Sequence, residues 1–121
     1  MTPTGAWAAT AAILLALAVA LGAFGAHGLR DRLDAYSMGV YEKAVLYHFI
    51  HALGLLFVST LARSTYTAWA SILLLAGIAI FSGSLYVLAV TGIRALGAIT
   101  PIGGLSFIAA WVVLAVGLAR R

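Results

Sequence analysis

The sequence predicts an all-α fold, an integral membrane antiparallel four-helix bundle. Three observations lead to this prediction: 64% of the 121 residues are hydrophobic, only 8% are charged, and the apolar residues form four long runs. Soluble domains carry about 25% charged residues. A soluble chain of this length could not bury so much apolar surface, so lipid is the expected solvent.

Each of the four apolar runs is long enough for a helix that crosses a bilayer, which needs about 20 residues. They divide a single transmembrane domain, residues 1–121, into spans at 5–26, 44–62, 68–90 and 99–118. The first run has no Lys or Arg before it and continues to Phe24. It is therefore expected to be a retained span and not a cleaved signal peptide.

Charges and turn residues mark the ends of the other three spans. The second span follows Lys43 and is closed by Arg63, and the third is followed by Gly92 and Arg94. The fourth carries Pro101 in its first turn, where a missing amide hydrogen removes no helix hydrogen bond. The connections after the second and third spans are short, so neighbouring helices are expected to be antiparallel.

The longest connection, GLRDRLDAYSMGVYEKA, joins the first two spans. Within it, Leu29, Leu33 and Tyr36 share one face at helical spacing. Two interpretations remain open for this segment: a short interfacial helix that lies among the lipid headgroups, or a polar loop.

This connectivity places both chain ends on one side of the membrane, here called the terminal side, and the polar residues toward the opposite side, the far side. The polar residues of the far half are His27, Tyr41, Glu42, Lys43, Tyr47, His48, His51, Ser82, Ser84, Tyr86, Thr91 and Thr100. The terminal half is mostly Ala, Leu, Ile and Val. The chemistry of this protein is therefore expected in the far half.

A stripe of five residues runs along the second span. Tyr41, Ala44, His48, His51 and Leu55 follow spacings of 3, 4, 3 and 4 residues, which place them on one helix face. Polar groups that faced lipid would lack hydrogen-bond partners, so the stripe is predicted to face the other helices. His51 lies roughly 10 Å inside the span at 1.5 Å per residue, where a neutral imidazole is favoured.

The candidate site is a polar cluster with a binding or a structural role. Its predicted members are His27, Tyr47, His48, His51, Ser82 and Tyr86. We expect His51 to hydrogen-bond to a neighbouring helix near Ser82, Tyr86 or the segment around His27. No catalytic residue is predicted.

Three interpretations of this cluster remain open. In the structural one, each imidazole bonds a group on a neighbouring helix, a contact worth about 0.6 kcal/mol on average in membranes. In the second, His27 adds a third nitrogen to a metal or haem site, although His-x-x-His alone is a weak signal. In the third, His48, His51 and Glu42 form a small-molecule, quinone or proton site. The structural interpretation is preferred, so neither a metal nor a cofactor is predicted.

Close packing in lipid depends on van der Waals contact, which small residues allow. In the first span, Ala8, Ala12, Ala16 and Ala20 recur at every fourth position. The small residues expected to bring helices close together are Gly22, Ala26, Gly83, Gly103 and Gly104. The sequence does not distinguish contacts within one chain from contacts between chains.

Several segments taken together resemble a known family. They are GAFGAHGL at 22–29, YHFIHALGLL at 47–56, and FSGSLYVLAVTG at 81–92 followed by TPIGGLSFIAAW at 100–111. In this order and spacing they resemble the YgdD-like family of small membrane proteins, which includes eukaryotic transmembrane protein 256. His27 and His51 match its recurring histidines. The resemblance covers nearly the whole chain and implies a four-span protein of the bacterial inner membrane or an equivalent organelle membrane. It implies no catalytic residues.

Two function classes follow. The preferred one is an accessory or structural membrane protein that packs with itself or with a larger complex. The alternative is a small-molecule, quinone or ion binder or transporter with its site around the histidines of the second span. An enzyme is not expected, because the sequence has no paired carboxylates, no defensible Ser/His/Asp order and no phosphate-binding glycine loop beside a lysine.

The expected partners are membrane lipids, a second copy of the chain or a larger membrane complex. Nucleic acid is not expected, because the seven basic residues are spread along the chain and form no block. The expected location is the cell inner membrane, crossed several times. Both termini are expected in the cytoplasm, because Arg120 and Arg121 form the one adjacent basic pair at a span end.

Overall fold

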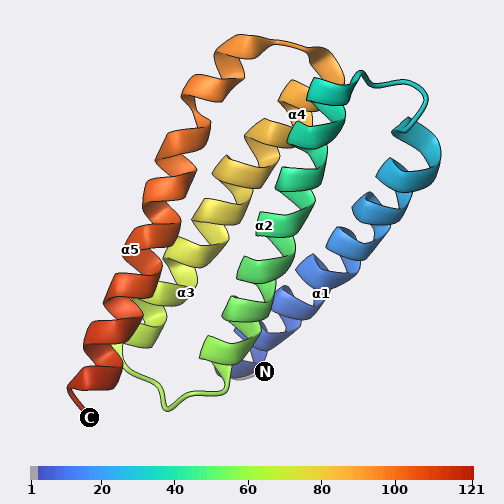
Figure 1. Ribbon diagram of the computed structural model, residues 1–121. Coiled ribbons are helices and arrows are strands. Elements are labelled where there is room, and N and C mark those ends of the chain that lie inside the picture. Colours follow the sequence, from blue (N-terminus) through green and yellow to red (C-terminus); the bar gives the residue numbers. More distant parts are fainter. Residues whose placement is uncertain (1–2) are drawn as a thin grey trace.

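The computed structural model describes residues 3–121, so the first two residues of the predicted domain lie outside it. Helices make up nearly all of the described chain, which confirms the all-α fold. Four helical rods run alternately up and down, and both termini lie at the same end of the molecule as the α2–α3 loop (Figure 1). This end is the terminal side defined above.

Two of the rods contain more than one helix type. The elements in chain order are α1 (Pro3–Phe24), the π-helix η1 (Gly25–Leu29), α2 (Ala35–Ser59), α3 (Thr65–Gly77), the π-helix η2 (Ile78–Ser82), α4 (Gly83–Thr91), the 3-10 helix η3 (Arg94–Ala98) and α5 (Thr100–Ala119). The first rod is α1 with η1, the second is α2, the third is α3–η2–α4 without a break, and the fourth is α5. Pro101 occupies the first turn of α5, as predicted.

Three of the rods, not four, are long and apolar enough to cross a membrane by their length and composition. The segments are Gly5–Leu29 of the first rod, Thr65–Thr91, which is the third rod, and Arg94–Ala119, which is η3 together with the fourth rod. The second predicted span, 44–62, is not among them. Residues 44–59 of this span belong to α2, where the polar residues Glu42, Lys43, His48 and His51 lower the hydropathy.

The connection before the second predicted span is not one long loop and contains no separate interfacial helix, because residues 30–34 form a short turn and α2 already begins at Ala35. Asp34 caps α2, and its carboxylate accepts a 2.7 Å hydrogen bond from the amide of Ser37. This hydrogen bond is the main reason that the pKa of the Asp34 carboxyl lies below its usual value. Residues 35–43 are thus the first turns of α2. Tyr36, which was expected in a loop or a short interfacial helix, lies at the start of this long helix.

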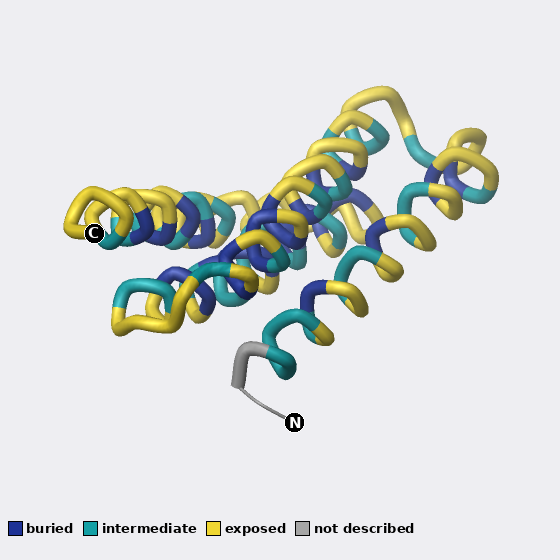
Figure 2. Tube along the Cα trace, turned by 90° about the horizontal axis from the view of Figure 1, so that it is seen from below, coloured by how far each residue is buried: buried dark blue, intermediate teal, exposed yellow. Residues whose placement is uncertain are grey.

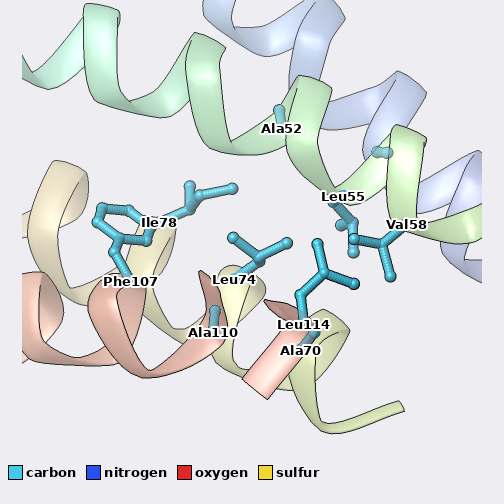
Figure 3. Close-up of a cluster of buried hydrophobic side chains, with 10 residues drawn as sticks. Ala52, Leu55, Val58, Ala70, Leu74, Ile78, Phe107, Ala110 and Leu114 are labelled. Atoms are coloured by element: carbon cyan, nitrogen blue, oxygen red, sulfur yellow. The ribbon is translucent and has the colours of Figure 1, made fainter. Parts of the chain in front are cut away.

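The main hydrophobic core lies between α2, α3 and α5 (Figure 3). Leu55 and Val58 of α2 point toward Leu74 of α3 and Leu114 of α5, and all four side chains are buried. Since the terminal halves of these helices carry few polar residues, their contact is almost entirely hydrocarbon. This core fixes the terminal half of the bundle.

The first rod lies at the edge of the molecule (Figure 2). It packs mainly against α2, where Ala11 and Ala18 are fully buried. The four alanines predicted as its packing face are placed differently, because Ala12, Ala16 and Ala20 are exposed. Alanine occurs on both faces of α1, so the period of small residues alone could not select the face that contacts α2.

A π-helical turn divides the third rod into two halves that pack against different helices. In a π-helix the hydrogen bonds run from i to i+5, which widens the turn. Before η2, the rod packs mainly against α5, and beyond it, α4 packs mainly against α2. Ser82, the last residue of η2, is fully buried and donates a 2.8 Å hydrogen bond to the Ala44 carbonyl of α2.

Candidate functional site

The predicted stripe of α2 faces the protein interior. Tyr41, Ala44, His48, His51 and Leu55 are all buried, and the two histidines are only 2% and 6% exposed. The prediction that both imidazoles face inward is therefore confirmed. Different members of the stripe contact different helices: Tyr41 contacts α1, His48 contacts α4 and His51 contacts α5.

His48 joins α2 to α4. Its Nδ1 lies 2.8 Å from the hydroxyl oxygen of Tyr86, and the histidine tautomer decides which atom donates. Its Nε2 is buried and makes no hydrogen bond with the described residues. In the tautomer that carries its hydrogen on Nε2, the Tyr86 hydroxyl donates to Nδ1.

Tyr41 and Tyr86 continue this polar contact toward the far side. Their rings meet edge to face with centroids 5.4 Å apart. The Tyr41 hydroxyl donates to the carbonyl of Leu21 and so connects α2 to α1. A chain of polar contacts thus runs from α1 through α2 to α4 and connects three of the four rods.

The expectation for His51 is wrong in its partner. Its Nδ1 donates a 2.8 Å hydrogen bond to the Tyr47 carbonyl one turn earlier in the same helix. Its contact with another helix is ring stacking on Phe107 of α5, with centroids 3.5 Å apart and planes 13° apart. Trp111, one turn further along α5, lies at 5.8 Å. His51 therefore lies in an aromatic contact, and His48 makes the hydrogen bond between helices.

Of the remaining predicted cluster members, Ser82 and Tyr47 contact other parts of the protein, and His27 lies apart from them. Ser82 contacts the backbone of α2 as described above. The Tyr47 ring packs at a tilt against the Phe81 ring with centroids 4.6 Å apart, and the Tyr47 side chain is 36% exposed. His27, in η1, is exposed and is not brought together with the other two histidines. Among residues 3–121, no group of three or more His, Cys, Asp and Glu side chains could hold a metal ion.

The helix-packing residues also differ from one another. A Cβ added at Gly103 would lie within 3.0 Å of the Phe81 backbone, so α5 and η2 approach closely there. Gly22 and Gly104 make ordinary contacts, at 3.4 Å from Val45 and 3.8 Å from Phe81. Gly83 is not one of these contacts, because a Cβ there would meet no atom within 4 Å. Ala26 is exposed.

Between residues 3 and 121, four glycines provide space for aromatic rings of other helices, and sequence reasoning missed two of them, Gly54 and Gly77. A Cβ at any of them would collide with a ring on another helix, and the pairs are Gly25 with Tyr41, Gly54 with Trp111, Gly77 with Phe107, and Gly117 with Tyr66. Each glycine provides the space in which a ring lies against the backbone. The i, i+4 spacing of Phe107 and Trp111 was a usable signal, because it places both rings on one face of α5.

Among the cavities that open on the described part of the molecule, four have volumes of 280 to 370 Å³. Neither His48 nor His51 lines any of them. One cavity, of 350 Å³, lies between α1 and α2 and is lined by Arg30, Tyr41 and Glu42 among apolar residues. The histidines are thus packed by protein, while the polar residues nearer the far side border an open space.

We expect Tyr86→Phe to destabilise the bundle only modestly. The change removes the hydroxyl that bonds His48 Nδ1 and leaves a second buried ring nitrogen without a partner. Side-chain hydrogen bonds between membrane helices are worth about 0.6 kcal/mol on average and at most about 2 kcal/mol. Unfolding in detergent would measure the loss, with Tyr36→Phe, which removes the hydroxyl of a half-exposed ring, as the matched control. Equal stability of both variants would show that the His48 bond contributes nothing.

Comparisons with known proteins find a family and several close relatives. Residues 21–104 match the family model described as "Protein of unknown function (DUF423)". The chain is 51% identical over 105 residues to the UPF0382 membrane protein of Staphylococcus haemolyticus, an alignment that covers 85% of this chain and 86% of that protein. It is 47% identical over 116 residues to the UPF0382 membrane protein YwdK of Bacillus subtilis, with 90% and 92% covered. No solved structure matches the chain. The motif-based resemblance to the YgdD-like family is consistent with these matches, and that name stays a prediction.

Proposed function

Because the chain belongs to the DUF423 family and is a small membrane protein, we propose that it crosses the membrane four times and acts as an accessory or structural protein. In this proposal it packs with a second copy of itself or with a larger membrane complex. No catalytic step is assigned to it.

The burial of the polar residues of α2 supports the fourth span. With 25 residues, α2 is about 37 Å long at 1.5 Å per residue, more than the roughly 30 Å of a bilayer core. Both of its histidines are covered by neighbouring helices. A helix whose polar groups are shielded from lipid can cross a membrane at lower hydropathy than its neighbours.

The packing around His51 supports a structural role over a binding role. Its ring is stacked on Phe107 and its Nδ1 is already bonded to Tyr47. A ligand that coordinated this ring would have to displace an aromatic side chain of α5. The aromatic contact therefore serves better to hold α2 and α5 together than to accept a ligand.

The single observation that carries the proposal of an accessory role is the exposed alanine flank of α1. Ala9, Ala12, Ala16, Ala20 and Ala23 are exposed, while the adjacent exposed flank carries Ile13, Leu17 and Phe24. Small residues let two helix backbones approach in lipid, where no hydrophobic force drives helices together. The alanine flank is therefore the surface at which another transmembrane helix would pack.

We expect Ala16→Trp to abolish association of the purified protein, because the indole would hold a second helix away from the alanine flank. The measurement is native mass spectrometry in mild detergent, together with cross-linking in membranes. Leu17→Trp is the matched control, since it places the same ring on the bulky flank one residue away. Association that survives Ala16→Trp but is lost in Leu17→Trp would contradict the proposed surface. A wild-type protein that is monomeric and without partners in both assays would contradict the accessory role.

For location, we propose the cell inner membrane with both termini in the cytoplasm. Support comes from Arg63, Arg120 and Arg121, which lie at the terminal side without any acidic side chain, in keeping with the bias of basic residues toward the cytoplasm. A C-terminal phosphatase fusion that is active, beside a fluorescent fusion that stays dark, would reverse this orientation.

A second candidate function is the binding of a quinone or another small molecule in the cavity between α1 and α2. Tyr41 and Glu42 line that cavity, and the Tyr41 ring contacts Tyr86, the partner of His48. Mass spectrometry of the purified protein tests this function. An organic molecule that co-purifies with the wild type and is lost from Glu42→Gln would favour binding over the accessory role.

A further inference from the structure

The charges of this chain are distributed unequally between the two ends of the bundle. All three acidic residues, Asp31, Asp34 and Glu42, belong to the far side, together with four of the seven basic residues. The other three basic residues, Arg63, Arg120 and Arg121, belong to the terminal side, where the sequence has no acidic side chain. The terminal side therefore carries an uncompensated positive charge.

The fold brings these three arginines to one cavity. Arg63 lies in the loop between α2 and α3, and Arg120 and Arg121 follow the last turn of α5. The α2–α3 loop and the C-terminus lie at the same end of the molecule (Figure 1). A cavity of 370 Å³ is lined by all three arginines and also by apolar parts of α5 at Gly117 and Leu118. A cationic rim thus borders an apolar wall.

None of these three guanidinium groups makes a hydrogen bond or an ion pair with another group in residues 3–121. The basic residues of the far side differ. Arg94 lies over the ring of Tyr36 at 4.7 Å, and Arg30 donates to the carbonyl of Ala26. The donors of the terminal side are therefore available to a ligand, while at least two guanidinium groups of the far side already contact the protein.

We propose that this cavity binds the phosphate headgroup of an anionic phospholipid. Arginine donates paired hydrogen bonds that match phosphate oxygens, and basic pockets between membrane helices are suited to anionic headgroups. The α2 helix ends at Ser59 and α5 at Ala119, which places the cavity at the headgroup level of a four-span bundle. The apolar wall at Leu118 then lies beside the acyl chains. This lipid site lies on another surface than the alanine flank of α1 and goes beyond the accessory role.

The test is lipid retention by the full-length protein, purified from nanodiscs of phosphatidylglycerol or of phosphatidylcholine and analysed by native mass spectrometry. We expect specific retention of phosphatidylglycerol by the wild type. A variant with Arg63→Gln, Arg120→Gln and Arg121→Gln should lose about 100-fold in apparent affinity, since each basic residue near an anionic surface contributes roughly fivefold. Arg94→Gln, which removes one charge at the other end, should retain the lipid.

Three further outcomes decide the proposal. Equal retention of phosphatidylglycerol by the wild type and the triple glutamine variant would overturn it, as would equal retention of phosphatidylcholine by the wild type. Displacement of the lipid by excess inorganic phosphate would overturn the lipid assignment in favour of a free anion. If the glutamine variant fails to fold, the corresponding triple lysine variant keeps the charge and removes only the paired geometry. Reduced retention of phosphatidylglycerol by this variant supports the proposal, and unchanged retention contradicts it.

Discussion

Gly103→Leu is expected to destabilise the bundle by about 3 kcal/mol or more, at the upper end of the cost of overpacking. A Cβ at this position would lie within 3.0 Å of the backbone nitrogen and the Cα of Phe81. Backbone atoms cannot rotate away as the end of a side chain can, so α5 and η2 would have to separate. Unfolding of the purified protein in detergent, followed by circular dichroism, measures the loss.

Gly83→Leu is the matched control, because it makes the same substitution at a position where a Cβ meets no atom within 4 Å. Its expected cost is close to zero, since leucine also favours the helix more than glycine does. The sequence predicted that both glycines bring helices close together, and the structure shows a close approach only at Gly103. Equal losses in the two variants would show that close approach of α5 to η2 does not limit stability.

Phe107→Ala is expected to cost about 3–5 kcal/mol, the usual range for removing a large buried aromatic side chain. The ring fills the space at Gly77 and stacks on His51. It also contacts Phe81 at 5.5 Å between centroids. Its loss would leave a cavity between three rods and uncover a buried imidazole, so lipid or water would reach the interior of the bundle.

The control for Phe107→Ala is Ile108→Ala, which truncates the neighbouring residue whose side chain is 61% exposed. Lipid already covers that side chain in the proposed arrangement, so its loss leaves no cavity and should cost much less. Detergent unfolding of both variants under the same conditions gives the comparison. A smaller loss for Phe107→Ala than for Ile108→Ala would contradict the proposed role of the aromatic contact.

The inward direction of His48 and His51 could be predicted because it follows from local rules. Helical spacing places both on one face, and a polar group cannot face lipid without cost. The partner of each ring could not be predicted in the same way. It depends on how α4 and α5 are rotated about their own axes, and this rotation is set by contacts among all the helices. His51 meets a phenyl ring and His48 a phenol hydroxyl for this reason.

The contacts of glycine and alanine were the least predictable from sequence. A glycine adjacent to open space and a glycine beneath an aromatic ring have the same sequence signature, as Gly83 and Gly54 illustrate. On α1, alanines at both 11 and 12 are compatible with close packing, and only Ala11 is buried. The start of α2 was visible in principle, since aspartate is among the preferred capping residues. The charges around Asp34 led instead to the expectation of a loop or a separate helix.

The π-turn in the third rod makes the number of residues between 78 and 82 as important as their identity. If these residues formed ordinary α-helical turns at the same length, everything after them would rotate around the helix axis, because each residue of a π-turn advances by a smaller angle than each residue of an α-helix. Leu85 and Leu88, which are now buried, would then turn away from their present neighbours. Deletion of one residue, for example the exposed Ala79, would close an α-helical turn and leave α4 close to its present orientation. A single-residue deletion should therefore be tolerated in this segment and not elsewhere in the third rod.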